Sequence, residues 1–201
     1  NTDTLSVVTS LSGGPTLSNV GTASDGSDGD GSARIIATTV AAGTDLSMQS
    51  MMGNASSGQR RHIPYFYIKF KLREISGYRF WAGISDSLLR ASDTNDATHH
   101  CAVRFSSGAG DTTFQFSTAD GTNAGRVNTG ITIVADTLYE IELWEGDSSA
   151  YCRINNSVVS VRTSNLSGST TAKTSVGAEL RSITAGTEYG FKFYNSTYSQ
   201  S

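Results

Sequence analysis

Apolar and polar side chains alternate with a period of two along most of the chain after Pro64. In residues 65–72 (YFYIKFKL), phenylalanine, isoleucine and leucine occupy the even positions, and tyrosine and lysine occupy the odd ones. Residues 78–84 follow the same pattern, with Phe80 and Trp81 on opposite faces. Because successive side chains of a strand point to opposite faces of a sheet, this period predicts half-buried strands.

Shorter alternating runs recur along the rest of the sequence. They predict further strands at residues 101–105, 114–116, 139–143, 150–154, 159–161, 176–180 and 189–193. Turn signals such as Asp120-Gly121 separate these runs. Only residues 85–91 favour a helix, of about two turns. Many short strands without a long amphipathic helix predict an all-β fold, either a two-sheet sandwich or a closed barrel.

Residues 1–58 differ from the alternating part, because serine, threonine, glycine and aspartate dominate there. Their apolar residues include two short clusters, Leu5, Val7 and Val8, and then Ile35, Ile36 and Val40. A segment of this composition has too few apolar side chains to build its own core. We therefore expect two units, an extended arm at 1–58 and a sandwich domain at 59–201. The short strands of the arm are expected to add to the sheet edge of a neighbouring subunit.

Length and charge narrow the range of partners. A chain of 201 residues fits a single sandwich with a sizeable core. Charged residues make up only 16% and the formal net charge is −3, whereas phosphate binding needs clustered lysine and arginine. No apolar run approaches the roughly 20 residues of a membrane-spanning helix, and no segment resembles a signal peptide. Neither nucleic acid nor a membrane is expected as a partner.

Several segments between Tyr78 and Tyr194 carry a resemblance to a known family. They are residues 80–86 (FWAGISD), 102–114 (AVRFSSGAGDTTF), 135–143 (ADTLYEIEL), 150–155 (AYCRIN) and 163–167 (TSNLS). In this order they resemble the concanavalin A-like, laminin G-like jelly-roll domains of structural proteins from tailed bacteriophages. The resemblance covers a little over half of the chain and leaves out the arm. It implies a two-sheet antiparallel jelly-roll sandwich displayed on a virion, often near host-surface glycans.

A glutamate-rich run, Glu140-Ile-Glu-Leu-Trp-Glu145, is the main catalytic hypothesis. Laminarinase-type glycoside hydrolases share the jelly roll and carry a similar Glu-x-Asp-x-x-Glu motif, whose outer glutamates act as nucleophile and acid. Here Glu142 replaces the aspartate, and Glu145 falls on the face opposite Glu140 unless a bulge intervenes. We expect the glutamates to be solvated strand positions, and we therefore expect no catalytic residue.

Metal and cofactor sites have little support in the sequence. Asp25, Asp28 and Asp30 with their interleaved glycines form a weak candidate calcium loop, which lacks the glutamate and helices of an EF-hand. The adjacent His99 and His100 point to opposite faces of a strand and are unsuited to sharing an ion. No metal and no cofactor is expected. Cys101 and Cys152 could form one bridge, but two buried thiols fit free cysteine better.

Aromatic faces beside short polar side chains are typical of sugar-binding sites. Trp81 points away from Phe80, a polar loop at 85–100 follows it, and Trp144 and Tyr151 bracket a neighbouring hairpin. The candidate carbohydrate-binding residues are Trp81, Asp86, Asp93, Asn95, Asp96, His99, Trp144 and Tyr151. The alternative for Trp81 is packing against the arm or a second subunit, because large aromatic side chains also anchor interfaces.

These observations lead us to expect a non-enzymatic virion surface protein, a capsid decoration (cement) protein assembled in the host cytoplasm. Its expected partners are capsid or other virion proteins, further copies of itself in a homo-oligomer and, in some cases, host-surface glycans. The chain shows no coiled-coil heptads and no fibre repeats, so decoration fits better than a fibre shaft. Two alternatives remain open: a glycan-binding adhesin of a tail or head fibre, and a glucan-cleaving glycoside hydrolase.

Overall fold

The computed structural model describes residues 16–17, 33–38, 42–43, 45–51, 64–167, 175–185 and 189–200. These residues form strands and no helix. The strands are β1 (Thr16–Leu17), β2 (Ala33–Thr38), β3 (Asp45–Met51), β4 (Pro64–Leu72), β5 (Tyr78–Ser85), β6 (His99–Ser106), β7 (Thr113–Asp120), β8 (Ala124–Thr132), β9 (Leu138–Glu145), β10 (Ala150–Ile154), β11 (Ser157–Arg162), β12 (Ser175–Ser182) and β13 (Tyr189–Gln200).

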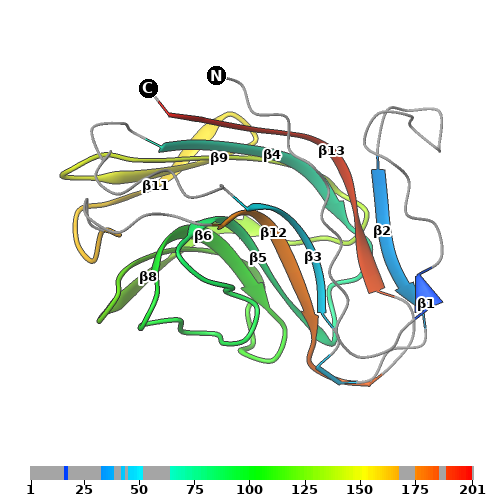
Figure 1. Ribbon diagram of the computed structural model, residues 1–201. Coiled ribbons are helices and arrows are strands. Elements are labelled where there is room, and N and C mark those ends of the chain that lie inside the picture. Colours follow the sequence, from blue (N-terminus) through cyan, green and yellow to red (C-terminus); the bar gives the residue numbers. More distant parts are fainter. Residues whose placement is uncertain are drawn as a thin grey trace.

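The strands form two antiparallel sheets that pack face to face. The seven-stranded sheet has the order β1-β2-β13-β4-β9-β10-β11, and the six-stranded sheet has the order β3-β12-β5-β6-β7-β8. The seven-stranded sheet arches over the six-stranded one (Figure 1). The predicted fold class is confirmed: the protein is an all-β jelly-roll sandwich.

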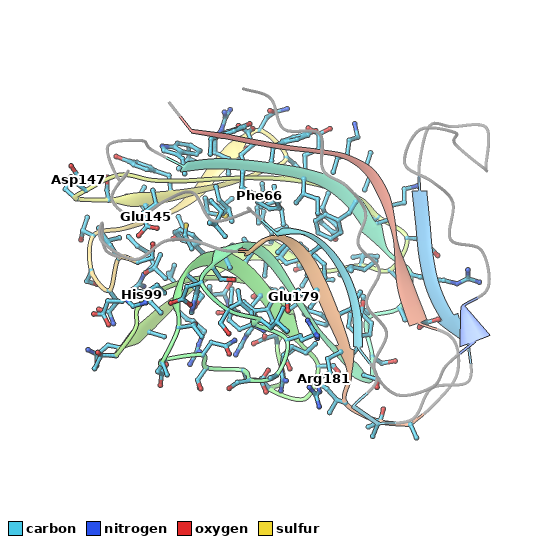
Figure 2. All side chains as sticks on the ribbon, in the orientation of Figure 1. Phe66, His99, Glu145, Asp147, Glu179 and Arg181 are labelled. Carbon is cyan, nitrogen blue, oxygen red and sulfur yellow. The ribbon has the colours of Figure 1, made fainter. Side chains whose placement is uncertain are left out.

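The inward positions of both sheets are the apolar ones that the alternation selects. Phe66, Ile68, Phe70 and Leu72 of β4 are all fully buried. The Phe70 ring packs against that of Phe80 from β5, with centroids 4.8 Å apart, and so joins the two sheets. Figure 2 shows Phe66 in the same layer between the sheets. Each such side chain contributes about 1.5–3 kcal/mol through burial.

Two segments of the predicted arm pair with strands of the predicted sandwich domain. β2 pairs with β13, with Ile36 opposite Gly190, and β3 pairs with β12, with Met48 opposite Ala178. This differs from the expected addition to a neighbouring subunit. The chain itself offers the edges of β12 and β13, and reaching them requires only the closure of a loop. Leu5, Val7, Val8, Val40, Asp25, Asp28 and Asp30 lie outside the described residues.

The predicted helix at 85–91 does not form. β5 continues through Ser85, and residues 86–98 form an irregular loop that leads to β6. The main-chain N–H groups of Leu89 and Arg90 donate to the Glu179 carboxylate, each at 3.1 Å, and this holds the loop on the sheet. β8 is missing from the predicted strands because it is an edge strand with mostly exposed side chains, which leaves little apolar alternation to detect.

Candidate functional site

The structure divides the sequence-predicted sugar-binding residues between the two outer faces of the sandwich. Trp144 of β9 and Tyr151 of β10 belong to the seven-stranded sheet. Trp81 lies on the outer face of the six-stranded sheet, with the loop at 86–98 beside it. The residues at or next to that loop are Asp86, Asp93, Asn95, Asp96 and His99. The eight candidates therefore do not form one site.

On the seven-stranded sheet, three aromatic side chains lie on neighbouring strands. Trp144 is opposite Tyr65 on β4 and opposite Tyr151 on β10, so the three residues form one line across the sheet. The rings of Trp144 and Tyr151 stack with centroids 5.0 Å apart and an interplanar angle of 11°. All three side chains are half-buried on a face that points away from the core. We call Tyr65, Trp144 and Tyr151 the aromatic row.

A polar line runs beside the aromatic row. Tyr67, Glu142 and Arg153 lie opposite one another on β4, β9 and β10. The Glu142 carboxylate accepts a hydrogen bond from the Tyr65 hydroxyl at 3.2 Å and one from Arg153 Nη1 at 3.3 Å. Burial, followed by the charge of Glu142, raises the pKa of Tyr65 to about 12, so its hydroxyl stays protonated and donates at neutral pH. Arg153 Nε is buried without a partner in the described part of the chain.

The glutamates of the β9 run split between the two faces of this sheet. Glu140 lies on the outer face with Glu142 and pairs with Lys69 Nζ at 2.7 Å. Glu145 is buried on the inner face (Figure 2), where its carboxylate accepts hydrogen bonds from the Ser167 N–H, at 2.5 Å, and from the Ser167 hydroxyl. The opposite orientation of Glu140 and Glu145 agrees with the alternation, so these two carboxyl groups cannot flank one glycosidic bond.

On the six-stranded sheet, Trp81 is fully buried by the loop at 86–98. Its indole packs against Leu89 and Ala102, and its Nε1 donates to the Ser92 carbonyl at 3.2 Å. An indole with 0% exposure has no face on which a sugar could stack in this conformation. Trp81 is therefore closed to a sugar in the free protein, and its role as a sugar contact stays a prediction. Among the described residues, the loop that directly follows β5 supplies the cover through Leu89 and Ser92.

Asp93 fixes the middle of this loop to the sheet. Its carboxylate accepts two hydrogen bonds from Arg79, at 2.6 and 2.7 Å. Its main-chain carbonyl accepts from Arg104 at 2.6 Å and from Arg126 at 2.8 Å. Burial raises the pKa of Asp93, but the hydrogen bonds and charge of Arg79 and the charge of Arg104 outweigh it, and the net pKa is lowered. Asp93 is therefore charged and held by three guanidinium groups.

The remaining loop candidates mainly hold the loop together. Asn95, with a φ of 53°, donates from its amide to the Leu89 carbonyl at 2.7 Å. His99 Nδ1 lies 2.8 Å from the Asp86 carboxylate. Asp96 is exposed. These residues were predicted from composition alone. Composition does not distinguish polar side chains that bind a ligand from polar side chains that hydrogen-bond within their own loop.

Glu179 on β12 is the main residue of this face that sequence reasoning missed. Besides accepting from two loop N–H groups, its carboxylate lies 3.4 Å from Arg90 Nη1 (Figure 2 labels Glu179). Burial raises the pKa of Glu179 in spite of these partners. Its one available signal was a glutamate within the otherwise apolar run at residues 176–180, because a buried carboxylate needs partners.

Within the described residues, no group of three or more histidine, cysteine, aspartate or glutamate side chains is placed to hold a metal ion. Cys101 and Cys152 are both free and buried, as the composition suggested, and burial raises the pKa of the Cys152 thiol. The part of the chain that the structure describes contains no helix with the length and apolar character needed to cross a membrane.

No protein-family model matches the chain, and no curated protein matches it significantly. Among solved structures, a protein of unknown function from Shewanella oneidensis MR-1 is similar, with a TM-score of 0.65, 12% identity, and coverage of 96% of this chain and 78% of that one. The alginate lyase A1-II′ of polysaccharide lyase family 7 has a TM-score of 0.51 and 16% identity, over 87% of this chain and 82% of that one. A Bacillus licheniformis β-glucanase has a TM-score of 0.53 and 10% identity, over 83% of this chain and 78% of that one. At these identities the likeness establishes the fold.

The prediction that this protein is not an enzyme is contradicted by these comparisons. The solved structures that share its fold include alginate lyases and a β-glucanase, which are enzymes. The prediction depended on the mismatch between the β9 glutamates and the laminarinase-type motif. That motif represents one catalytic arrangement for one reaction on glycans, and its absence does not exclude others. None of the structures named here is described as a virion protein. The capsid, virion-surface and homo-oligomer assignments stay predictions from the sequence.

Proposed function

We propose that this protein is a glycan-active jelly roll that binds a polysaccharide chain on the outer face of the seven-stranded sheet. The observation that carries the proposal is the aromatic row, Tyr65, Trp144 and Tyr151, with the polar line of Glu142 and Arg153 beside it. Both alternatives predicted from the sequence, the adhesin and the glycoside hydrolase, involve a glycan, and the proposal keeps that shared feature. It makes no statement about whether the protein belongs to a virion.

The chemistry of this face suits a sugar. Sugar rings present apolar C–H faces and a rim of hydroxyl groups, and binding sites for them combine aromatic surface with a few fixed polar groups. The aromatic row crosses three strands spaced about 4.8 Å apart, so it is long enough for a disaccharide unit. Glu142 and Arg153 supply acceptors and donors along one side of the row, and their mutual pairing keeps the face close to neutral.

Tryptophan fluorescence offers a direct test with a neutral glycan, because the chain has two tryptophans and, in the free protein, Trp81 is fully buried whereas Trp144 is half-exposed. We expect a β-glucan to shift the emission of the native protein. Trp144→Ala and Tyr151→Ala should each weaken binding, measured by calorimetry, by about tenfold or more. Val134→Ala is the matched control, because Val134 is 52% exposed and lies outside both sheets. The proposal fails if no polymer binds, or if Trp144→Ala binds as the native protein does.

Cleavage is a second candidate function that one contact favours. Glu142 touches Tyr65 of the aromatic row, and Glu140 lies two residues away on the same face. Glycoside hydrolysis uses a pair of carboxyl groups on either side of the scissile bond. We expect release of reducing ends from a bound β-glucan, lost in Glu142→Gln while binding is retained. Formation of an unsaturated uronate from alginate would instead indicate a lyase, and unchanged release by Glu142→Gln would exclude this residue.

A further inference from the structure

The outer face of the six-stranded sheet carries side chains that a covered sheet face does not need for stability. Trp81 lies opposite Arg104, and Arg104 lies opposite Gln115 on the next strand. Arg104 is only 5% exposed and Arg79 is nearly as buried. Small apolar side chains would fill the space beneath the loop without the desolvation that guanidinium groups require. An aromatic ring beside several cations is instead the composition of a site for an anionic ligand.

The cations of this face converge on one residue of the loop. Arg79 chelates the Asp93 carboxylate through two parallel hydrogen bonds, and Arg104 and Arg126 bind its carbonyl. Arg104 Nη2 donates to both carboxylate oxygens of Asp111, each at 2.8 Å. Arg104 Nε is buried and has no partner among the described residues. The cluster therefore keeps an unused donor although it already contains two aspartates.

The contact with Asp93 lies at the surface. The Asp93 side chain is 31% exposed, and Arg126 is exposed as well. The apolar anchor of the loop on this face is Leu89, packed on Trp81, whereas Leu88 points to solvent and is 41% exposed. The end of the loop that carries Asp93 is thus held mainly by charged hydrogen bonds. Another carboxylate could make the same bonds, because the paired geometry of arginine and carboxylate is general.

We propose that Arg79, Arg104 and Arg126 form a binding site for the carboxylate of a uronic acid, which Asp93 of the protein's own loop occupies in the free state. A uronate in an acidic polysaccharide displaces Asp93, takes its two hydrogen bonds from Arg79 and uncovers Trp81. The choice of a sugar acid rests on the proposed function, but the site is separate from the aromatic row. Asp93 competes with the ligand for Arg79. The measured association constant therefore equals the intrinsic one multiplied by the fraction of molecules in which Asp93 has left the site.

The first test compares an alginate oligosaccharide with a β-glucan oligosaccharide of equal length, by calorimetry. Asp93→Asn weakens the internal contact, so the variant should bind the alginate oligosaccharide about tenfold more tightly and the neutral one unchanged. Adding Arg79→Gln should remove the gain. The proposal is overturned if Asp93→Asn does not raise alginate affinity, or if the double variant keeps the gain. Failure of the proposed function is seen separately, as neutral-glycan binding that Trp144→Ala leaves intact.

A second measurement keeps the loop sequence native and so does not depend on how Asp93→Asn folds. In Trp144→Phe, Trp81 is the sole tryptophan and is shielded from acrylamide by the loop. Adding the alginate oligosaccharide should increase acrylamide quenching of Trp81 severalfold, and the β-glucan oligosaccharide should not. Higher salt should weaken the effect, because it screens the attraction between the arginines and the charged oligosaccharide that arrives from solution. Quenching that does not change with the alginate oligosaccharide at saturation contradicts the displacement of the loop.

Discussion

The two outer faces of this sandwich contain one tryptophan each, at equivalent outward positions of alternating strands, and the two have opposite environments. Trp144 is half-exposed beside Tyr151, whereas Trp81 is fully buried beneath the loop at 86–98. The strands alone would leave both residues facing solvent. What separates them is a connection between β5 and β6 that folds back over its own sheet. The sheet therefore sets the direction in which an aromatic side chain points, and the loops decide whether it is exposed to solvent.

The strongest test of this comparison removes each tryptophan in turn. Trp81→Ala should lower the free energy of unfolding by about 3–5 kcal/mol, because it leaves a cavity under the loop. Trp144→Ala should cost about 1 kcal/mol, because much of its ring is already in contact with water. Urea denaturation of both variants provides the measurement. Equal losses would mean that the loop does not cover Trp81 in solution.

Acid should loosen the covered face through Asp93. Its pKa is lowered from the ordinary value of 3.8, so the contact with Arg79 stabilises the folded loop above that pH and is lost as the pH falls through the folded-state value. Glu179 acts in the opposite sense, because its raised pKa means that ionising it opposes folding. In Trp144→Phe, acrylamide quenching of Trp81 should rise in acid.

Adding Asp93→Asn to Trp144→Phe isolates the contribution of Asp93 from that of Glu179. The added substitution should raise quenching already at neutral pH and flatten its pH dependence. Superimposable pH profiles with and without Asp93→Asn would show that Asp93 does not hold the loop.

The smallest effect is expected on the open face. Tyr65→Phe removes one hydroxyl that donates to Glu142, at a position that water can reach, and should cost about 0.5 kcal/mol or less. Chemical denaturation measures this loss, and Lys69→Ala, which breaks an exposed ion pair with Glu140, is the matched control of similar size. A loss of several kcal/mol would mean that the polar line is part of the fold and unsuited to a ligand.

The fold was predictable because buried strand positions must be apolar, and this requirement produces a visible alternation in the sequence. Phe66, Ile68, Phe70 and Leu72 had to be apolar to fill the space between the sheets, and their spacing revealed both the strand and its inner face. β8 left no such trace, since an edge strand with exposed side chains is not constrained to alternate. The pairing of β2 and β3 within the chain depended on which distant edges were free, and local composition does not encode this.

The candidate site was predictable only in part. Trp144 and Tyr151 were identified as aromatic residues near one hairpin, but Tyr65 joined them through the register between β4 and β9, which a single sequence does not show. The three arginines around Asp93 come from β5, β6 and β8 and are brought together only by folding. For Trp81 the sequence indicated the outward position, but not the loop that covers the side chain, because that cover depends on how residues 86–98 fold back over the sheet.

The position of β13 has a consequence for how the protein is made. Residues 189–200 form the third strand of the seven-stranded sheet, between β2 and β4, although they follow the other described strands in the sequence. During synthesis on the ribosome, β4 therefore waits for a neighbour more than a hundred residues away, with one edge unpaired. Such long-range pairing slows folding and prolongs the exposure of aggregation-prone edges. A nascent chain halted before Tyr189 should consequently be a substrate for chaperones, with its seven-stranded sheet still in two pieces.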